Sequence, residues 1–237
     1  RLENAGRLVH RREISVRCPD FSTDSGARET PLARPRRGHP APSSTDNFGS
    51  ALALEGSTLV VGAVGEDVGA TNAGLAYVYD LAGATPGTPV FTINNPAPAA
   101  SDGFGNAAAI SGTRVLIAAS ADDAGATNAG TVYVYDLASG TPTAPVLTLN
   151  NPAAALSDAF GNAVALSGTT AVVGCAADDD TAADAGRVFV FDLASGTPGT
   201  PAVTLQRPTP VAGDQFGYAV ALSGTRLAVG APLDDSV

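Results

Sequence analysis

Apolar residues in this chain come in short runs of about four to six positions, and each run ends at a break of Gly, Pro, Ser or Asp. In residues 187–192 valine alternates with phenylalanine, so the valines are expected on one face of a strand and the rings on the other. No run repeats with the period of an amphipathic helix. The pattern predicts an all-β chain built from short strands.

One stretch of the chain shows four such runs in succession. The first two flank Ser167 and Gly168, a tight-turn signal, so we expect them to pair as an antiparallel hairpin. An acidic loop leads to the third run, and prolines separate the third run from the fourth. The predicted strands are 163–166, 171–174, 187–192 and 202–205.

An Asp-x-Phe-Gly motif begins each copy of this unit, and its phenylalanine returns every 56 residues without insertion or deletion. A fixed period is typical of a repeat architecture, and four antiparallel strands per unit are typical of a β-propeller blade. A β-solenoid is the main alternative, but its strands run parallel. The motif residues are Asp46, Phe48, Gly49, Asp102, Phe104, Gly105, Asp158, Phe160, Gly161, Asp214, Phe216 and Gly217.

The period divides the chain into a leader and an array. We expect the array to be an arc of a larger propeller, because propellers close with about four to eight blades. The alternative is that strands of the leader complete a fourth blade. The chain opens without methionine and stops within a repeat, and we expect it to be a fragment of a longer protein. The leader is 1–45, and the repeats are 46–101, 102–157, 158–213 and the partial 214–237.

The leader is irregular and rich in Arg and Pro, with remnants of a preceding repeat at residues 4–7 and 40–42. We interpret residues 8–39 as a frame-shifted or recombined segment. Low apolar content predicts disorder over residues 20–44. A natural basic linker or a nucleic-acid-binding arm is the alternative.

Charge is divided unevenly between the two parts. The leader holds 9 Arg and 5 acidic residues, whereas residues 46–237 hold 4 Arg and 18 acidic residues. So acidic an array is expected to repel nucleic acid and anionic membranes and to attract cations or basic partners. No stretch reaches the ~18 apolar residues of a membrane span.

Each part of the motif has an expected structural role. The phenylalanine is predicted to be a wedge between blades, because a lone four-stranded unit cannot bury both faces. The glycine permits a backbone bend, and the aspartate is expected to close an Asx turn onto nearby amides. Third-strand aromatics are expected to pack between blades; a sugar-binding surface, formed with the aspartate that ends the strand, is the alternative. Those aspartates are Asp80, Asp136 and Asp192.

Phe216-Gly217 followed by Gly230-Ala231-Pro232 resembles the FG-GAP repeat, which is known from the β-propeller head of integrin α chains and from many bacterial surface proteins. A looser copy lies at 160–161 and 174–176, and residues 130–135 look like the family's third strand. The resemblance covers 46–237. It implies a β-propeller and a secreted or cell-surface location.

Integrin-type repeats often carry an Asp-rich calcium loop between the first two strands. Here that connection is Ser-Gly-Thr, as at residues 167–169, and it has no carboxylate for the six to eight oxygen ligands of Ca²⁺. The usual family site is therefore not expected. Carboxylates cluster one loop later, where they could hold a Ca²⁺ ion or form a solvated acidic turn. The candidate ligands are Asp178, Asp179, Asp180 and Asp184.

These observations favour a non-catalytic module for protein or glycan binding, or adhesion, with no cofactor except a possible Ca²⁺. A purely structural spacer is the alternative, and a hydrolase or lyase is less favoured, because the repeats hold no His or Lys. The two cysteines are not expected to form a disulfide. Cys175 takes the place of an alanine in the other copies, so we expect a small buried residue.

Overall fold

The computed structural model describes residues 40, 43 and 45–235. Almost all of the leader, with its predicted disorder, its frame-shifted stretch and any strands it contributes to a blade, lies outside the described residues. Every regular element in the described part is a β-strand, which confirms the all-β prediction. The strands are β1 (Phe48–Glu55), β2 (Thr58–Ala63), β3 (Leu75–Asp80), β4 (Phe91–Asn94), β5 (Phe104–Ser111), β6 (Arg114–Ala119), β7 (Thr131–Asp136), β8 (Leu147–Asn150), β9 (Val164–Ser167), β10 (Thr170–Cys175), β11 (Arg187–Asp192), β12 (Val203–Leu205), β13 (Ala219–Ser223) and β14 (Arg226–Gly230).

The strands form three four-stranded sheets and one two-stranded sheet, each in chain order. We name the sheets blade 1 (β1–β4), blade 2 (β5–β8), blade 3 (β9–β12) and the C-terminal hairpin (β13–β14). All neighbouring strands pair antiparallel, and β9 pairs with β10 across the predicted Ser-Gly turn. This pairing excludes the parallel coils of a β-solenoid.

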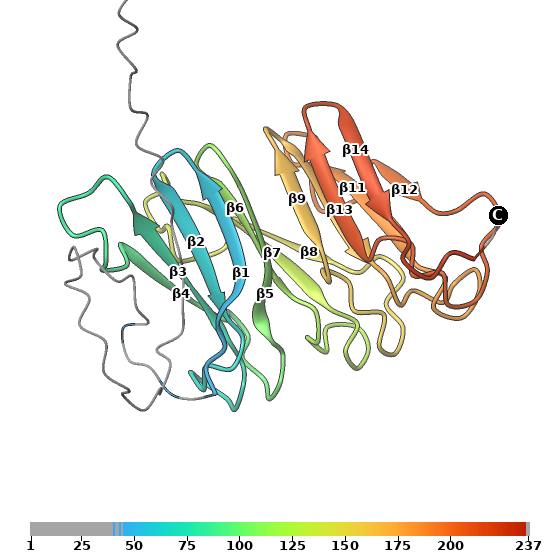
Figure 1. The fold of residues 1–237 in the computed structure, drawn as a ribbon, viewed down its shortest axis with the longest axis horizontal. Helices are drawn as coiled ribbons and strands as arrows, with labels where there is room; N and C mark the ends of the chain where they lie inside the picture. Colours follow the sequence, from blue (N-terminus) through green and yellow to red (C-terminus); the bar gives the residue numbers. More distant parts are fainter. Residues whose placement is uncertain (1–39, 41–42, 44, 236–237) are drawn as a thin grey trace, which may run out of the picture.

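The blades lie side by side in an open arc, in chain order from left to right in Figure 1. The first strands of successive units are neighbours, since β1 contacts β5, β5 contacts β9, and β9 contacts β13. The β-propeller prediction is therefore confirmed. The three complete blades and one hairpin of the described residues are an arc of such a propeller.

The motif phenylalanine lies between consecutive blades. Phe104 is fully buried in a cluster that includes Val60 and Ile93 of blade 1 and Tyr133 and Tyr135 of blade 2. Its ring centroid lies 5.8 Å from that of Tyr133 and 6.5 Å from that of Tyr135, within the range of favourable aromatic pairs. The third-strand rings are likewise buried, so the structure supports packing and not an aromatic sugar-binding surface.

Glycines allow the backbones of adjacent blades to touch. A Cβ built on Gly62 of blade 1 would lie 2.0 Å from the carbonyl oxygen of Gly105 at the start of blade 2. Gly105 itself has a φ of 93°, a conformation that L side chains rarely adopt. A polar side chain of the preceding blade also reaches this segment, since the Ser50 hydroxyl donates a 3.0 Å hydrogen bond to the Gly105 carbonyl.

Candidate functional site

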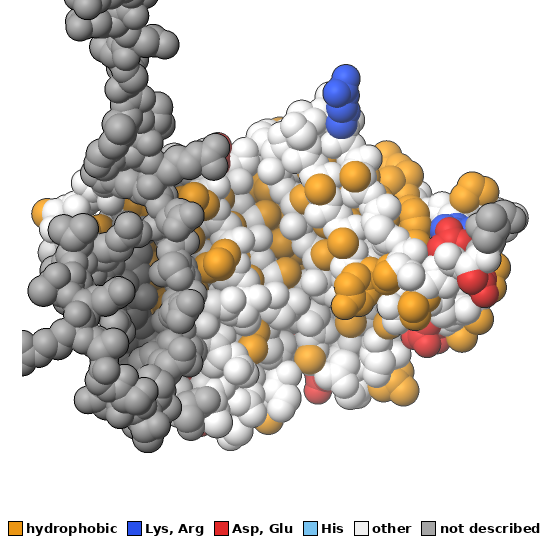
Figure 2. Space-filling view, viewed as in Figure 1, with side chains coloured by type: hydrophobic (Ala, Val, Ile, Leu, Met, Phe, Trp, Pro, Cys, Tyr) orange, Lys and Arg blue, Asp and Glu red, His pale blue; other side chains and the backbone are white. Residues whose placement is uncertain are grey.

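The loops that connect the second and third strands of the blades lie at one edge of the molecule, at the bottom of Figure 1. Each of these loops, and the segment that follows β14, carries an acidic residue that we call the loop acid: Glu66, Asp122, Asp178 and Asp234. We call this edge the acidic edge. Figure 2 shows the acidic side chains of the visible face mainly along the lower edge and at the C-terminal end.

The motif aspartate lies buried next to the loop acid of its own blade. In blade 2, Asp102 is 1% exposed, and its Oδ2 accepts hydrogen bonds of 2.7 Å from the Ala99 amide and the Asn95 side chain. The aspartate therefore bonds to a nearby amide, as expected, but this amide lies three positions upstream, so the bond does not close an Asx turn. Burial, followed by the nearby charges of Asp122 and Asp123, raises the pKa of Asp102.

In blades 1 and 2 the loop acid is satisfied by hydroxyl groups of the third strand. Tyr77 donates a 2.7 Å hydrogen bond to Glu66. Asp122 accepts hydrogen bonds from Tyr133 and Thr131, each 3.1 Å long, and from the Ala124 amide at 2.9 Å. These tyrosines are largely buried, and burial is the main cause that raises their pKa.

Blade 3 satisfies its loop acid in a different way. Phe189 takes the place of the tyrosine and has no hydroxyl, and Arg187 takes the place of the threonine. The guanidinium of Arg187 lies 2.6 Å from both Asp178 and Asp180, and 5.3 Å from the centre of the Phe189 ring. An internal cation has therefore replaced the hydroxyl donors. Comparing residues 56 positions apart would have revealed this exchange in the sequence.

The four candidate calcium ligands do not converge on one point. Asp178 is buried, Asp180 pairs with Arg187, and Asp179 and Asp184 are exposed. The structure instead places Asp178 near Asp158 and Cys175, with one potential ligand atom of each within 4.8 Å of the others. Calcium binding at this loop stays a prediction, and an ion there would have to share Asp178 and Asp180 with the guanidinium.

Cys175 is fully buried, as expected, and its thiol is not part of a disulfide. Its sulfur donates a 3.3 Å hydrogen bond to the carbonyl oxygen of Asp158. Burial, followed by the charges of Asp178 and Asp158, raises the pKa of the thiol. The thiol is thus held in its neutral, unreactive form.

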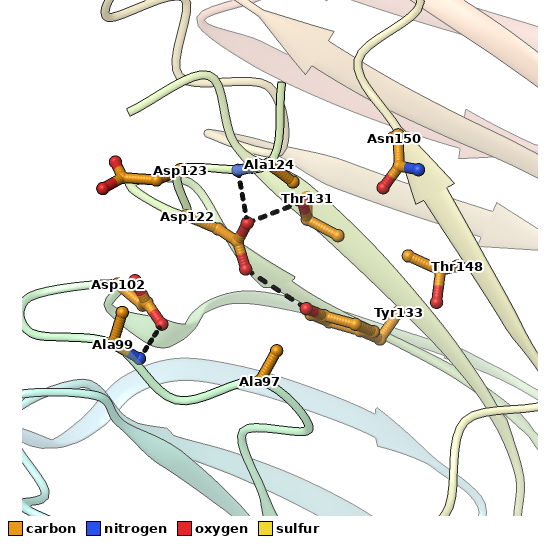
Figure 3. A pocket seen from close by; sticks show the side chains of 10 residues that line it. All are labelled: Ala97, Ala99, Asp102, Asp122, Asp123, Ala124, Thr131, Tyr133, Thr148 and Asn150. Carbon is orange, nitrogen blue, oxygen red and sulfur yellow. Dashed lines mark hydrogen bonds between the residues drawn. The ribbon is translucent and has the colours of Figure 1, made fainter. Parts of the chain in front are cut away.

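A pocket of about 270 Å³ opens at the acidic edge of blade 2. Figure 3 shows the carboxylate of Asp102 at the left, that of Asp122 above, and the Tyr133 ring at the right. Exposed residues from the preceding loop and from β8 complete the rim. The lining residues are Ala97, Ala99, Asp102, Asp122, Asp123, Ala124, Thr131, Tyr133, Thr148 and Asn150.

Fold and repeat together define the class of protein: a β-propeller repeat protein in which each 56-residue unit forms one antiparallel blade. The sequence pattern of the FG-GAP repeat matches residues 42–79, 96–135, 149–191 and 210–237. Because these matches cover more than half of it, the chain belongs to the FG-GAP repeat family. No helix in the described residues is long and apolar enough to cross a membrane.

Two designed proteins are among the solved structures to which this chain is similar. The crystal structure of the computationally designed Ika4 protein has a TM-score of 0.50 and 18% identity, over 82% of this chain and 88% of that chain. The computationally designed Ika8 protein gives 0.46 and 18%, over 77% of this chain and 42% of that one, so the chain spans less than half of it. The likeness to Ika4 concerns the fold alone. A search of curated protein sequences gives no match.

Proposed function

We propose that this chain is a non-catalytic module of a secreted or cell-surface protein, and that it binds a protein or glycan ligand at the acidic edge. Family membership supports the location, because FG-GAP repeats are typically extracellular. The observation that carries the binding role is the pocket of blade 2. Two largely buried carboxylates, those of Asp102 and Asp122, line this pocket. Neither of them forms an ion pair within the described residues.

The same residues give little support to catalysis. The repeats hold no His or Lys that could act as a base at neutral pH. Asp122 already accepts three hydrogen bonds, and Cys175 is enclosed in the core with a raised pKa. A site arranged in this way is suited to hold a polar or charged ligand.

A structural spacer is the second candidate. Ala165 and Val172 of blade 3 are buried in a cluster with side chains of the C-terminal hairpin, whereas the equivalent Ala221 and Ala228 of that hairpin are exposed. The hairpin therefore presents a face that a further blade would cover. Figure 2 shows apolar side chains over this part of the molecule.

Saturable binding separates the two functions. The full chain would be screened against a glycan array and a displayed peptide library, with Thr131→Arg as a variant whose pocket is filled. A binding module should give ligands that saturate and that the variant loses. A spacer should give none, and ligands that bind both proteins equally would contradict the proposed site.

A further inference from the structure

We propose that the pocket of blade 2 binds a guanidinium group, namely the side chain of an arginine in a basic protein ligand. The inference rests on the proposed function and names the chemistry of its ligand. It comes from comparing copies of the repeat within the molecule, since each copy places the same backbone around a different set of side chains.

In blade 3 the position that corresponds to the pocket is occupied by the chain itself. Asp122 corresponds to Asp178, and Thr131 corresponds to Arg187, each 56 residues further along. Arg187 spans the space between the Phe189 ring and the carboxylates, and its side chain is only 12% exposed. Blade 2 has threonine at this position, together with the same acid and an aromatic ring. The volume that the guanidinium fills in blade 3 is therefore open in blade 2.

A second guanidinium of the chain contacts the acid pair of the C-terminal hairpin, but from another position of the repeat, since Arg207 takes the place of Asn95 in blade 2. There Arg207 is ion-paired with the motif residue Asp214 and lies 3.0 Å from the loop acid Asp234. These two acids correspond to Asp102 and Asp122 of blade 2. Two copies of this acid pair thus include a residue that bonds to an arginine of the chain, whereas the pair in blade 2 has no such partner among the described residues.

The geometry favours a guanidinium over Ca²⁺. Both oxygens of Asp122 already accept hydrogen bonds, so they offer few free lone pairs to an ion that takes six to eight oxygen ligands. A volume of about 270 Å³ also suits a group much larger than a bare ion. Tyr133 lines the pocket at the repeat position of Phe189, the ring next to which Arg187 lies in blade 3, and a planar guanidinium packs against such rings better than an ammonium does.

The test is a titration of the full chain with N-acetyl-arginine methylamide, followed by the amide NMR signals of Asp122, Asp123 and Ala124. The citrulline analogue has the same shape without the charge, and CaCl₂ tests the metal. We expect saturable shifts at these amides with a dissociation constant on the order of 1 mM. The citrulline analogue should bind at least about tenfold more weakly, because hydrogen bonds to charged groups are the stronger ones.

Three variants locate the site. Thr131→Arg should abolish the shifts by filling the pocket, whereas Thr131→Val, which leaves the pocket open, should retain them. Asp122→Asn, which removes the charge at nearly constant shape, should weaken binding at least about tenfold. It provides the same test if Thr131→Arg does not fold.

Equal binding of arginine and citrulline, full binding to Thr131→Arg, or saturation by Ca²⁺ alone would overturn the inference. If the arginine compound fails and a glycan or a peptide without arginine binds in a way that Thr131→Arg abolishes, the guanidinium inference is wrong and the proposed function stands. If no ligand of any class binds, both are wrong.

Discussion

Replacing Phe104 by alanine tests whether burial between blades stabilises the array. The side chain is fully buried in a cluster to which both blades contribute. A buried phenylalanine removes on the order of 150 Å² of surface from water, and about 25 cal/mol per Å² gives about 4 kcal/mol. This agrees with the ~3–5 kcal/mol lost in such substitutions when the surroundings collapse only partly. Urea unfolding followed by circular dichroism measures the loss.

The matched control is Phe216→Ala, at the same motif position in the C-terminal hairpin. Phe216 is half-buried and packs on one side, in a cluster with blade 3. Its loss should therefore cost only about 1–2 kcal/mol. If Phe216→Ala costs as much as Phe104→Ala, the contribution comes from the local turn, and the account of blade stacking is refuted. Phe104→Leu is the milder substitution if the alanine variant does not fold.

Two further predictions concern the contact between blades and the buried acids. Gly62→Ala should lower the free energy of unfolding by about 1–3 kcal/mol, because its Cβ would meet the Gly105 carbonyl oxygen at 2.0 Å. The control is Gly140→Ala, which should leave the urea midpoint unchanged, because a Cβ at Gly140 would have no other atom within 4 Å. Equal effects would contradict backbone contact between blades. Asp102→Asn should raise the melting temperature at pH 7, and by a smaller amount as the pH falls towards 4. Burial raises the pKa of Asp102 in the folded state above the value near 3.9 that an aspartate has in the unfolded chain. The wild type therefore gains stability by taking up a proton as the pH falls through this range, whereas the variant does not. A difference that does not change with pH would contradict this.

The strands and their order could be predicted because the signals are local. Alternation over residues 187–192 and the Ser-Gly turn before β10 depend only on neighbours in the sequence, and both elements lie where the pattern places them. The fixed period then extends one unit to the others. The wedge position of the motif phenylalanine is likewise consistent with a unit that cannot bury both of its faces alone.

The partners of the acids could not be predicted in the same way. Asp102 accepts its hydrogen bonds from residues three and seven positions upstream, and the motif alone does not indicate on which side of the aspartate its partners lie. The link between Asp178 and Arg187 depends on how the connection 176–186 folds back onto β11. Only the change of residue type between copies carried that information. The pocket is lined by Thr131, which takes the place of Arg187, and a single copy of the motif does not reveal this difference.

The central proposal is that the acid pair of a blade binds a guanidinium, which the chain itself supplies in blade 3 and a ligand supplies in blade 2. Arg187→Thr tests it most directly, because it should open in blade 3 the pocket that blade 2 already has. Removing one partner of a buried ion pair destabilises strongly, by about 3–5 kcal/mol, so the variant should melt at a lower temperature.

The measurement is the melting temperature of Arg187→Thr with N-acetyl-arginine methylamide, with the citrulline analogue at equal ionic strength as the control. At ten times its dissociation constant the arginine compound should add about 1.4 kcal/mol of stability at the new site. We predict a rise in melting temperature that is larger than in the wild type and absent with citrulline. A variant that melts like the wild type, or that arginine stabilises no more than citrulline does, would contradict the account.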